Sequence, residues 1–328
     1  MKRLLNLSTH SHDLGLFEND WENARRMLGE YGFDAYELYP VDPYDYAQIP
    51  SELIAGIHLR FFVIIEPLWN ENRESLLRIF GDMETVEHFY GGLDRQAMID
   101  VYRAQLNLAH RLGCEYVVFH AAHCELEHVF DWEFPWRCED ILDLSAEIMN
   151  EVTRETDYEG WILFENLWWP GSFRCLVPSE IERLLSQVEH PRAGICLDTG
   201  HILNTNQSLA TEAEGIDYLL STVNGLGSLS EAVKGVHLTR SLSGEYVRAS
   251  RSTSEPYAEA DTFWDRLGIA REHVYKIDQH EGFEDSRIGE LFDLISPEFL
   301  TFEFTFRGMD EWRRKIEVQR RALAQFFD

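Results

Sequence analysis

Acidic side chains recur at the carboxyl ends of short apolar segments of this sequence. Glu165 follows Trp161-Ile162-Leu163-Phe164, Asp198 follows a similar apolar run, and Glu303 lies between two phenylalanines. An unpaired carboxylate is costly to bury in such a segment, so each of these groups needs a cationic partner. Lysine is nearly absent from the segment ends. A divalent metal ion is therefore predicted as the shared counter-charge.

Histidines stand at comparable positions. His58, His120 and His237 lie in or at the end of other apolar segments, and His201 follows Asp198 by three residues. Taken alone, a histidine near a strand end is more often a hydrogen-bonded structural residue than a ligand. Because imidazoles accompany the carboxylates, however, the metal is expected to be zinc, manganese, iron or cobalt rather than calcium. Asp278-Gln279-His280 is read either as two further ligands or as a salt bridge within a loop.

The elements that must position these groups are short, apolar on both faces, and separated by stretches of helical periodicity. Such segments are typical of buried parallel strands. The expected strands are Leu4–Ser8, Ala35–Tyr39, Ile54–Phe62, Tyr116–His120, Trp161–Glu165, Ala193–Asp198, Val233–Leu238 and Phe299–Thr305. The clearest expected helices are Trp21–Tyr31, Gln96–Leu112, one opening at Pro178, and Met309–Phe327.

Alternation of strand and helix over 328 residues predicts an α/β fold, a parallel eight-stranded (β/α)8 TIM barrel, as a single domain over residues 1–328. A doubly wound sheet is the main alternative, but no GxGxxG motif follows the first strand. In a barrel the carboxyl ends of all strands converge on one face, so the acidic and imidazole groups should meet there. Residues 240–276 are expected to form an extended loop or short helices over that mouth, where substrate specificity usually lies.

Composition excludes several classes of protein. The net charge is −29, which argues against a protein that coats nucleic acid or an anionic membrane, because both need a basic face. Five scattered cysteines without a CxxC pair indicate neither a disulfide framework nor a cysteine zinc site. Neither a signal peptide nor a transmembrane segment is predicted, so we expect a cytoplasmic protein that acts on a small molecule.

The strand-end motifs resemble those of the xylose-isomerase-like barrel superfamily, which holds sugar isomerases, epimerases and the endonuclease IV family. The motifs that carry the resemblance are Phe164-Glu165-Asn166, Leu197-Asp198-Thr199-Gly200-His201, Val236-His237-Leu238 and Phe302-Glu303-Phe304. A looser match in the first half rests on Tyr36-Glu37-Leu38, Gly56-Ile57-His58 and Phe119-His120-Ala121-Ala122-His123. The resemblance implies a homo-oligomer in some relatives, although the sequence offers no decisive exposed apolar face.

Similarity to the epimerases implies one metal ion, held by Glu165, Asp198, His237 and Glu303. Glu165 and Glu303 would then act on opposite sides of a bound sugar or sugar phosphate, one removing the proton next to a metal-polarised carbonyl and the other returning a proton. The residues expected to contact this substrate are His201, Arg240, Trp168 and Glu37. This metal-dependent isomerase or epimerase is the leading hypothesis.

Similarity to the endonuclease IV family implies instead a cluster of up to three metal ions that cleaves phosphoesters. Its further ligands would be His58, His120, His201, Asp278 and His280. The loops after the third to fifth strands are acidic and aromatic, as in Glu125-Leu126-Glu127-His128 and Leu167-Trp168-Trp169-Pro170. They suit a small phosphorylated substrate better than a DNA backbone. A barrel that only binds a sugar or a metal is a third reading.

Overall fold

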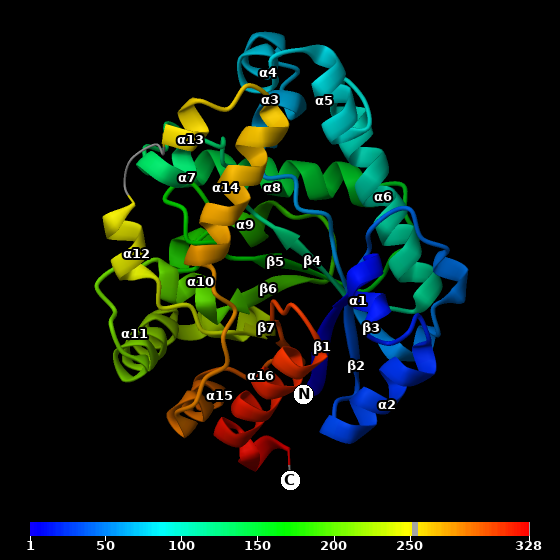
Figure 1. Ribbon diagram of the computed structural model, residues 1–328, viewed down its shortest axis with the longest axis vertical. Helices are drawn as coiled ribbons and strands as arrows, with labels where there is room; N and C mark the ends of the chain where they lie inside the picture. The colour runs from blue at the N-terminus through cyan, green and yellow to red at the C-terminus, as the bar shows by residue number, and fades with distance from the viewer. Residues whose placement is uncertain (251–254, 328) are drawn as a thin grey trace.

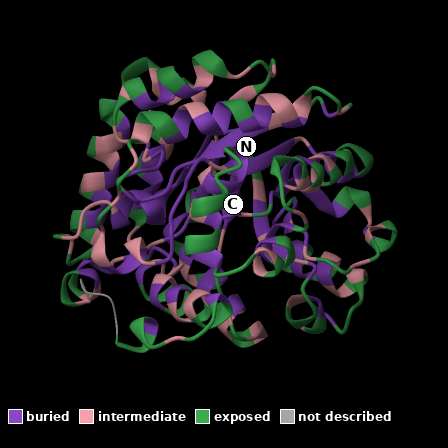
Figure 2. Cartoon of the chain, turned by 90° about the horizontal axis from the view of Figure 1, so that it is seen from above, coloured by how far each residue is buried: buried purple, intermediate pink, exposed green. Residues whose placement is uncertain are grey.

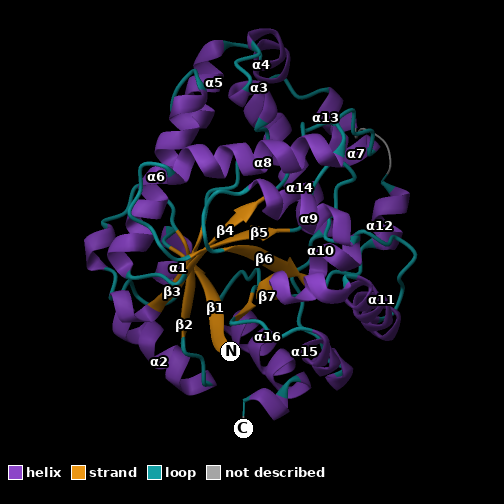
Figure 3. Cartoon of the chain, turned by 180° about the vertical axis from the view of Figure 1, so that it is seen from behind, coloured by secondary structure: helices purple, strands orange, loops and turns teal. Residues whose placement is uncertain are grey.

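A computed structural model gives the fold of residues 1–250 and 255–327. Over these residues eight parallel strands pair in sequence order, and β1 also pairs with β8, so that the sheet closes on itself (Figure 1; Figure 3). The strands are β1 (Lys2–Ser8), β2 (Ala35–Tyr39), β3 (Ile54–His58), β4 (Tyr116–His120), β5 (Trp161–Glu165), β6 (Ala193–Asp198), β7 (Val233–Leu238) and β8 (Phe299–Phe302). The predicted (β/α)8 TIM barrel is confirmed.

Helices surround the barrel and cover its mouth. The α-helices are α1 (Ser11–Gly15), α2 (Trp21–Tyr31), α3 (Glu66–Trp69), α4 (Arg73–Phe80), α5 (Met83–Tyr90), α6 (Arg95–Leu112), α7 (His128–Asp131), α8 (Cys138–Thr153), α9 (Pro178–Gln187), α10 (Thr199–Asn204), α11 (Glu212–Gly225), α12 (Gly244–Ala249), α13 (Glu255–Ala258), α14 (Phe263–Ile277), α15 (Leu291–Leu294) and α16 (Met309–Ala322). Short 3-10 helices are η1 (Tyr46–Gln48), η2 (Ser51–Leu53), η3 (Gly227–Ala232), η4 (Ser286–Glu290) and η5 (Ala324–Phe326).

The long outer helices begin and end where local chemistry dictates. The carboxylate of Asp20 accepts a hydrogen bond from the backbone N–H of Glu22 and caps α2, and Asp94 caps α6 in the same way. Gly32 and Gly113 then end these helices with φ of 71° and 70°, a left-handed conformation that glycine adopts without steric cost. Each helix thus stops just before the strand that follows it.

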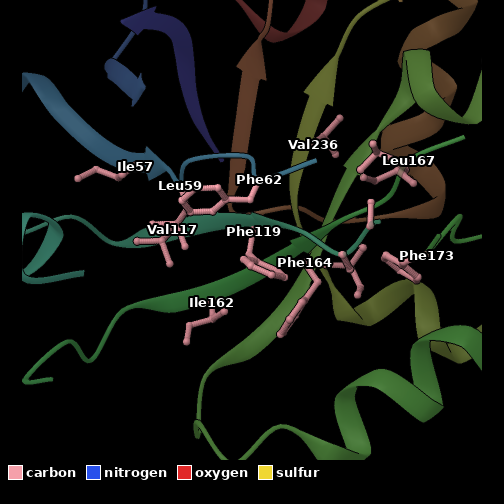
Figure 4. Packing of buried hydrophobic residues seen from close by; sticks show 14 of the residues in the cluster. Ile57, Leu59, Phe62, Val117, Phe119, Ile162, Phe164, Leu167, Phe173 and Val236 are labelled. Atoms are coloured by element: carbon pink, nitrogen blue, oxygen red, sulfur yellow. The ribbon is translucent and has the colours of Figure 1, made fainter. Parts of the chain in front are cut away.

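Two apolar layers hold the barrel together. Alternate strand residues point outward and pack beneath the helices, whose inner faces are buried while their outer faces are exposed (Figure 2). Figure 4 shows part of this layer, where Phe119 and Phe164 on neighbouring strands lie with ring centroids 5.9 Å apart. A smaller cluster, which includes Leu4, Tyr116 and Leu163, fills the barrel interior. The polar strand ends therefore rest on a packed apolar floor.

Several element boundaries differ from those predicted. Strand β3 ends at His58 and not at Phe62, and β8 ends at Phe302, which places Glu303 just beyond the sheet. The segment 240–276 contains the 15-residue helix α14 in place of a loop or short helices alone; residues 251–254 of that segment lie outside the described residues. The structure contains no helix in its described ranges long and apolar enough to cross a membrane.

Candidate metal centre

The strand register brings the predicted polar residues to one layer at the mouth of the barrel. His120 on β4 lies beside Glu165 on β5, and Asp198 on β6 lies beside His237 on β7. Since successive side chains on a strand alternate between its two faces, these residues point into the barrel while Phe119, Phe164 and their equivalents point outward. The carboxyl ends of the strands thus form a buried ring of acids and imidazoles.

Glu165 lies at the middle of this ring. Its Oε2 atom lies 3.1 Å from His58 Nε2 and 3.2 Å from His120 Nε2. Its Oε1 atom lies 3.2 Å from His237 Nδ1 and 3.5 Å from His201 Nδ1. The carboxylate is fully buried. Its two oxygens therefore face different imidazoles, those of His58 and His120 on one side and that of His237 on the other, and either oxygen could help to hold a cation.

A second group of ligand types forms around Asp278. Its Oδ2 atom lies 2.6 Å from His280 Nε2 and 3.3 Å from His201 Nε2. The hydroxyl of Ser241 donates to the other carboxylate oxygen at 3.2 Å. Although Asp278 and His280 stand far beyond β7 in the sequence, the chain returns them to the mouth after α14. Asp278 and His280 contact each other, as the salt-bridge interpretation expects, and Asp278 also contacts His201, so their role as ligands stays a prediction.

Backbone carbonyls orient three of the histidines. The Nδ1 atoms of His58, His201 and His280 lie 3.1, 2.7 and 2.9 Å from the carbonyl oxygens of Leu59, Asn166 and Glu303, respectively. A carbonyl can only accept, so each Nδ1 carries a hydrogen, and Nε2 points into the centre, where it can offer its lone pair once it has lost its own proton. This arrangement is common behind histidines that bind metals.

Unpartnered atoms in the donor set show whether it fits metal ions. Asp198 is fully buried, and its Oδ1 atom caps α10 by accepting from the backbone N–H of His201 at 2.6 Å. Its Oδ2 atom has no hydrogen-bond partner among the residues described. Asp198 shares a potential ligand cluster with Glu165, His237 and Glu303, whose donor atoms all lie within 4.8 Å of one another. A buried oxygen without a partner is what a missing cation would leave, so the residues fit a metal.

The pKa values reflect burial opposed by neighbouring charge. Burial raises the pKa of Asp198 to about 7, against the opposing charge of His201. Burial alone would lower the pKa of His280, but the adjacent carboxylate of Asp278 raises it to about 10. For His120, burial dominates and lowers the pKa to about 3. The protein itself thus balances charge by protonated histidines, and metal binding would have to release those protons.

Glu165 and Glu303 illustrate the same balance for the two glutamates. Burial would raise the pKa of Glu165, but the charges of His120 and His237 hold it well below its usual range. The pKa of Glu303 is lowered to about 2, because His237 and His280 outweigh its burial. Both groups are therefore carboxylates near neutral pH, and both are suited to hold cations.

The structure thus gathers every residue that the sequence suggested as a metal ligand. Three groups, each with donor atoms within 4.8 Å, include all of them, and two of the three share Glu165. They are His58 with His120 and Glu165; His201 with Asp278 and His280; and Glu165 with Asp198, His237 and Glu303. Their role as ligands remains a prediction, but the nine residues form one continuous centre.

Two of the predicted substrate contacts are placed elsewhere. Glu37 is buried behind His237, where its carboxylate lies 3.0 Å from His237 Nε2 and accepts from the hydroxyl of Tyr116 at 2.5 Å. The His237 imidazole separates this carboxylate from Glu165 and Glu303, and its role as a substrate contact stays a prediction. The guanidinium of Arg240 pairs with Glu212 at 2.6 Å, and its predicted contact with substrate likewise stays a prediction.

The other two predicted substrate contacts, His201 and Trp168, do lie at the centre. The Trp168 ring packs on His201 with centroids 4.9 Å apart, and its buried Nε1 lacks a partner in the described part of the chain. Sequence reasoning missed Tyr39 and Phe61, whose rings lie 5.1 Å from His58 and 4.3 Å from His120. Nothing in their local sequence separates them from ordinary core aromatics.

Comparison with known proteins identifies the fold family. Residues 83–253, just over half of the chain, match the family described as the xylose isomerase-like TIM barrel. The chain belongs to this family. The comparison of this chain with curated proteins found no match.

Solved structures with a similar fold include both epimerases and nucleases. A D-tagatose 3-epimerase-like protein matches this xylose isomerase-like barrel with TM-score 0.53 and 16% identity, covering 99% of this chain and 98% of its own. Endonuclease IV from Thermus thermophilus matches with TM-score 0.51 and 20% identity, covering 99% and 100%. The 3-keto-D-glucoside 4-epimerase of E. coli matches with TM-score 0.50 and 12% identity, covering 99% and 98%. At these identities the matches show the fold alone.

Proposed function

We propose that this protein is a multi-metal phosphoesterase that acts on a small phosphorylated molecule. The observation that carries the proposal is the position of Glu165, whose two oxygens face different histidine sets, beside a third group built on Asp278. The single-metal epimerase hypothesis accounts for His201 of that group as a substrate contact but assigns no role to Asp278 and His280. Up to three divalent ions could be held by the nine residues, with zinc, manganese, iron and cobalt suited to their mixture of imidazole and carboxylate.

The protein's own residues would position these ions and the substrate between them. Bound divalent ions would lower the pKa of water and stabilise the negative charge that develops on a phosphoryl oxygen. Glu165 and Asp278 hold the histidine sets at fixed distances, and the carbonyls of Leu59, Asn166 and Glu303 fix the direction of three rings. Trp168, packed on His201, excludes water from that side of the centre.

The charge around the mouth supports a small substrate over DNA. Glu125 is largely buried and Glu127 is partly buried, and both pair with Arg78. Arg240, the cation expected nearest the centre, is engaged by Glu212. Endonuclease IV, whose structure is similar in fold, is by its name a nuclease and therefore binds a nucleic acid. These carboxylates make the mouth a poor match for a long phosphate backbone, although Arg60, Arg111 and Arg271 line the neighbouring cavity.

The isomerase or epimerase hypothesis remains the second candidate because Glu165, Asp198, His237 and Glu303 form a complete four-ligand group. It asks Glu165 to transfer a proton. However, Glu165 is fully buried and both of its oxygens face imidazole nitrogens. This position favours a fixed ligand over a group that must also reach the substrate to move a proton.

The test compares both reactions on one metal-loaded preparation. Phosphatase and phosphodiesterase activity would be measured with phenyl phosphate and bis-phenyl phosphate, and isomerase chemistry by deuterium exchange from solvent into a panel of ketoses and their phosphates. We expect phosphate release that His280→Ala abolishes. Deuterium exchange without phosphate release, unaffected by His280→Ala, would refute the phosphoesterase in favour of the isomerase.

A further inference from the structure

A large cavity lies beside the candidate metal centre, and neither the phosphoesterase nor the isomerase reaction uses it. Its volume is about 1080 Å³, whereas pockets for drug-sized ligands measure roughly 300–1,000 Å³. A monosaccharide phosphate would leave most of this space empty. The cavity therefore has room for a substrate that carries, beside its phosphate, a part much larger than a monosaccharide.

The cavity adjoins the centre through three aromatic rings. Tyr39, Phe61 and Trp169 line it. The other sides of two of these rings pack on metal-ligand candidates, Tyr39 on His58 at 5.1 Å and Phe61 on His120 at 4.3 Å between centroids. A molecule with its phosphate at the centre would thus extend directly over Phe61 into the cavity.

Two helices from distant parts of the sequence form the facing walls. Figures 1 and 3 both show β4 between α6 on one side and α14 on the other. Helix α6 contributes Val101, Ala104 and Leu108 at helical spacing, and α14 contributes Trp264 and Leu267. Trp264 is 42% exposed although it is large and apolar. The two stripes face the cavity with apolar surface that the protein leaves uncovered.

The lining is apolar and aromatic at the wall and charged only at the rim. Its charged residues are Asp42, Arg60, His88, Asp100, Arg111 and Arg271, all exposed. Such a lining binds flat apolar groups by stacking and burial and offers few polar atoms to the hydroxyls of a sugar.

We infer that the substrate is a phosphate ester of a large, apolar, ring-containing alcohol, whose alcohol part occupies the cavity between α6 and α14. The inference rests on the proposed phosphoesterase function for the reacting phosphate. It assigns substrate specificity to Phe61, Trp169 and Trp264, none of which is placed among the metal ligands. In the reaction water adds to phosphorus, the P–O bond to the alcohol breaks, and the alcohol leaves with a proton from solvent.

The first test compares phenyl phosphate with 4-biphenylyl phosphate, whose leaving phenols differ little in acidity. The second ring should raise kcat/KM at least about 10-fold if it enters an apolar pocket. Ala104→Trp, which fills the cavity from α6, should remove most of that advantage, so that kcat/KM becomes similar for the two esters. Ala213→Trp on α11, also an exposed alanine on a helix, is the matched control and should change neither rate.

The second test does not depend on catalysis. Binding of 4-phenylphenol alone would be followed by calorimetry and by quenching of Trp264 fluorescence, with Trp264→Phe as the blank. Binding that Ala104→Trp abolishes, without hydrolysis of either ester, would support the cavity and refute the phosphoesterase. Equal hydrolysis of both esters, unchanged by Ala104→Trp, would refute the inference alone.

A change in molecular mass with Ala104→Trp, measured by light scattering, would show instead that a second copy covers this face and would also refute it.

Discussion

The metal centre and the neighbouring cavity share a wall at Tyr39 and Phe61 but are built in opposite ways. The centre consists of charged groups, buried and mutually compensated, at the ends of adjacent strands. The cavity consists of apolar side chains, partly exposed, on helices α6 and α14. At the centre, polar groups are buried where apolar groups are expected. In the cavity, apolar side chains are exposed where polar ones are expected. We propose that both departures from ordinary packing serve function, with chemistry at the centre and substrate recognition in the cavity.

The two regions should be separable by mutation. Glu165→Gln should have the largest effect, because it replaces the carboxylate that faces both histidine sets with a neutral amide. We expect the loss of at least one metal equivalent and a fall in phosphate release that exceeds the roughly 10–100-fold cost of changing an outer-shell partner. Elemental analysis and initial rates measure the two losses.

The same variant should leave the cavity intact, so its affinity for 4-phenylphenol should match that of the unmodified protein. Glu133→Gln, on an exposed glutamate, serves as the control for charge. Retention of full metal content by Glu165→Gln would contradict its role as a ligand, and loss of 4-phenylphenol binding would show that the two regions are one.

A smaller effect is expected from Glu37→Gln, which weakens the support behind His237. The carboxylate fixes the ring so that Nδ1 faces Glu165 and Glu303. Metal affinity, measured by competition with a chelator, should fall roughly 10–100-fold. Tyr116→Phe keeps the carboxylate and should have a weaker effect. If Glu37→Gln changed KM and left metal affinity alone, the original prediction of a substrate contact would be right after all.

The smallest effect concerns His123, a histidine as buried as the ligands but placed in apolar surroundings. Its Nδ1 accepts from the backbone N–H of Ile65, its ring packs on Trp136, and burial lowers its pKa to about 3. His123 therefore stays neutral in the folded protein, whereas it takes up a proton in the unfolded chain below about pH 6.5. Its contribution to the free energy of unfolding is present above that pH and is lost as the pH falls.

His123→Asn keeps an acceptor for Ile65 and removes this titration. Between pH 7.5 and 5.5 the unmodified protein should lose roughly 1 kcal/mol more of its free energy of unfolding than the variant does. Urea denaturation of both proteins measures the difference, in which contributions from the shared metal centre cancel. Equal losses would mean that His123 takes up a proton in the folded state.

The contrast between the two regions also explains what could be predicted from the sequence. Each ligand candidate on a strand stands at the end of an apolar run, so the barrel's parallel register brings Glu165, Asp198 and His237 together once the strands are recognised. Asp278 and His280 were recognisable only by their spacing, because α14 intervenes. The position of Glu37 below His237 was not predictable, since it depends on the β2–β3 bulge and on Tyr116 crossing the interior above Gly56.

The cavity was beyond sequence reasoning for a physical reason. Val101 and Ala104 lie in a stretch that the sequence predicts only as a helix, and Trp264 lies in the segment 240–276, which it predicts as a loop or short helices. Only the tertiary arrangement shows that α6 and α14 do not pack against each other there but leave space between them. Apolar periodicity predicts that a face is covered, and it does not tell whether protein or ligand covers it.

The most direct measurement is the number of metal ions per chain in protein purified without chelators and then reloaded with zinc or manganese. We predict about three, as the three ligand groups imply, falling by one in His280→Ala. One ion per chain, bound equally well by His280→Ala, would contradict the multi-metal centre and return the site to the four-ligand arrangement of an isomerase.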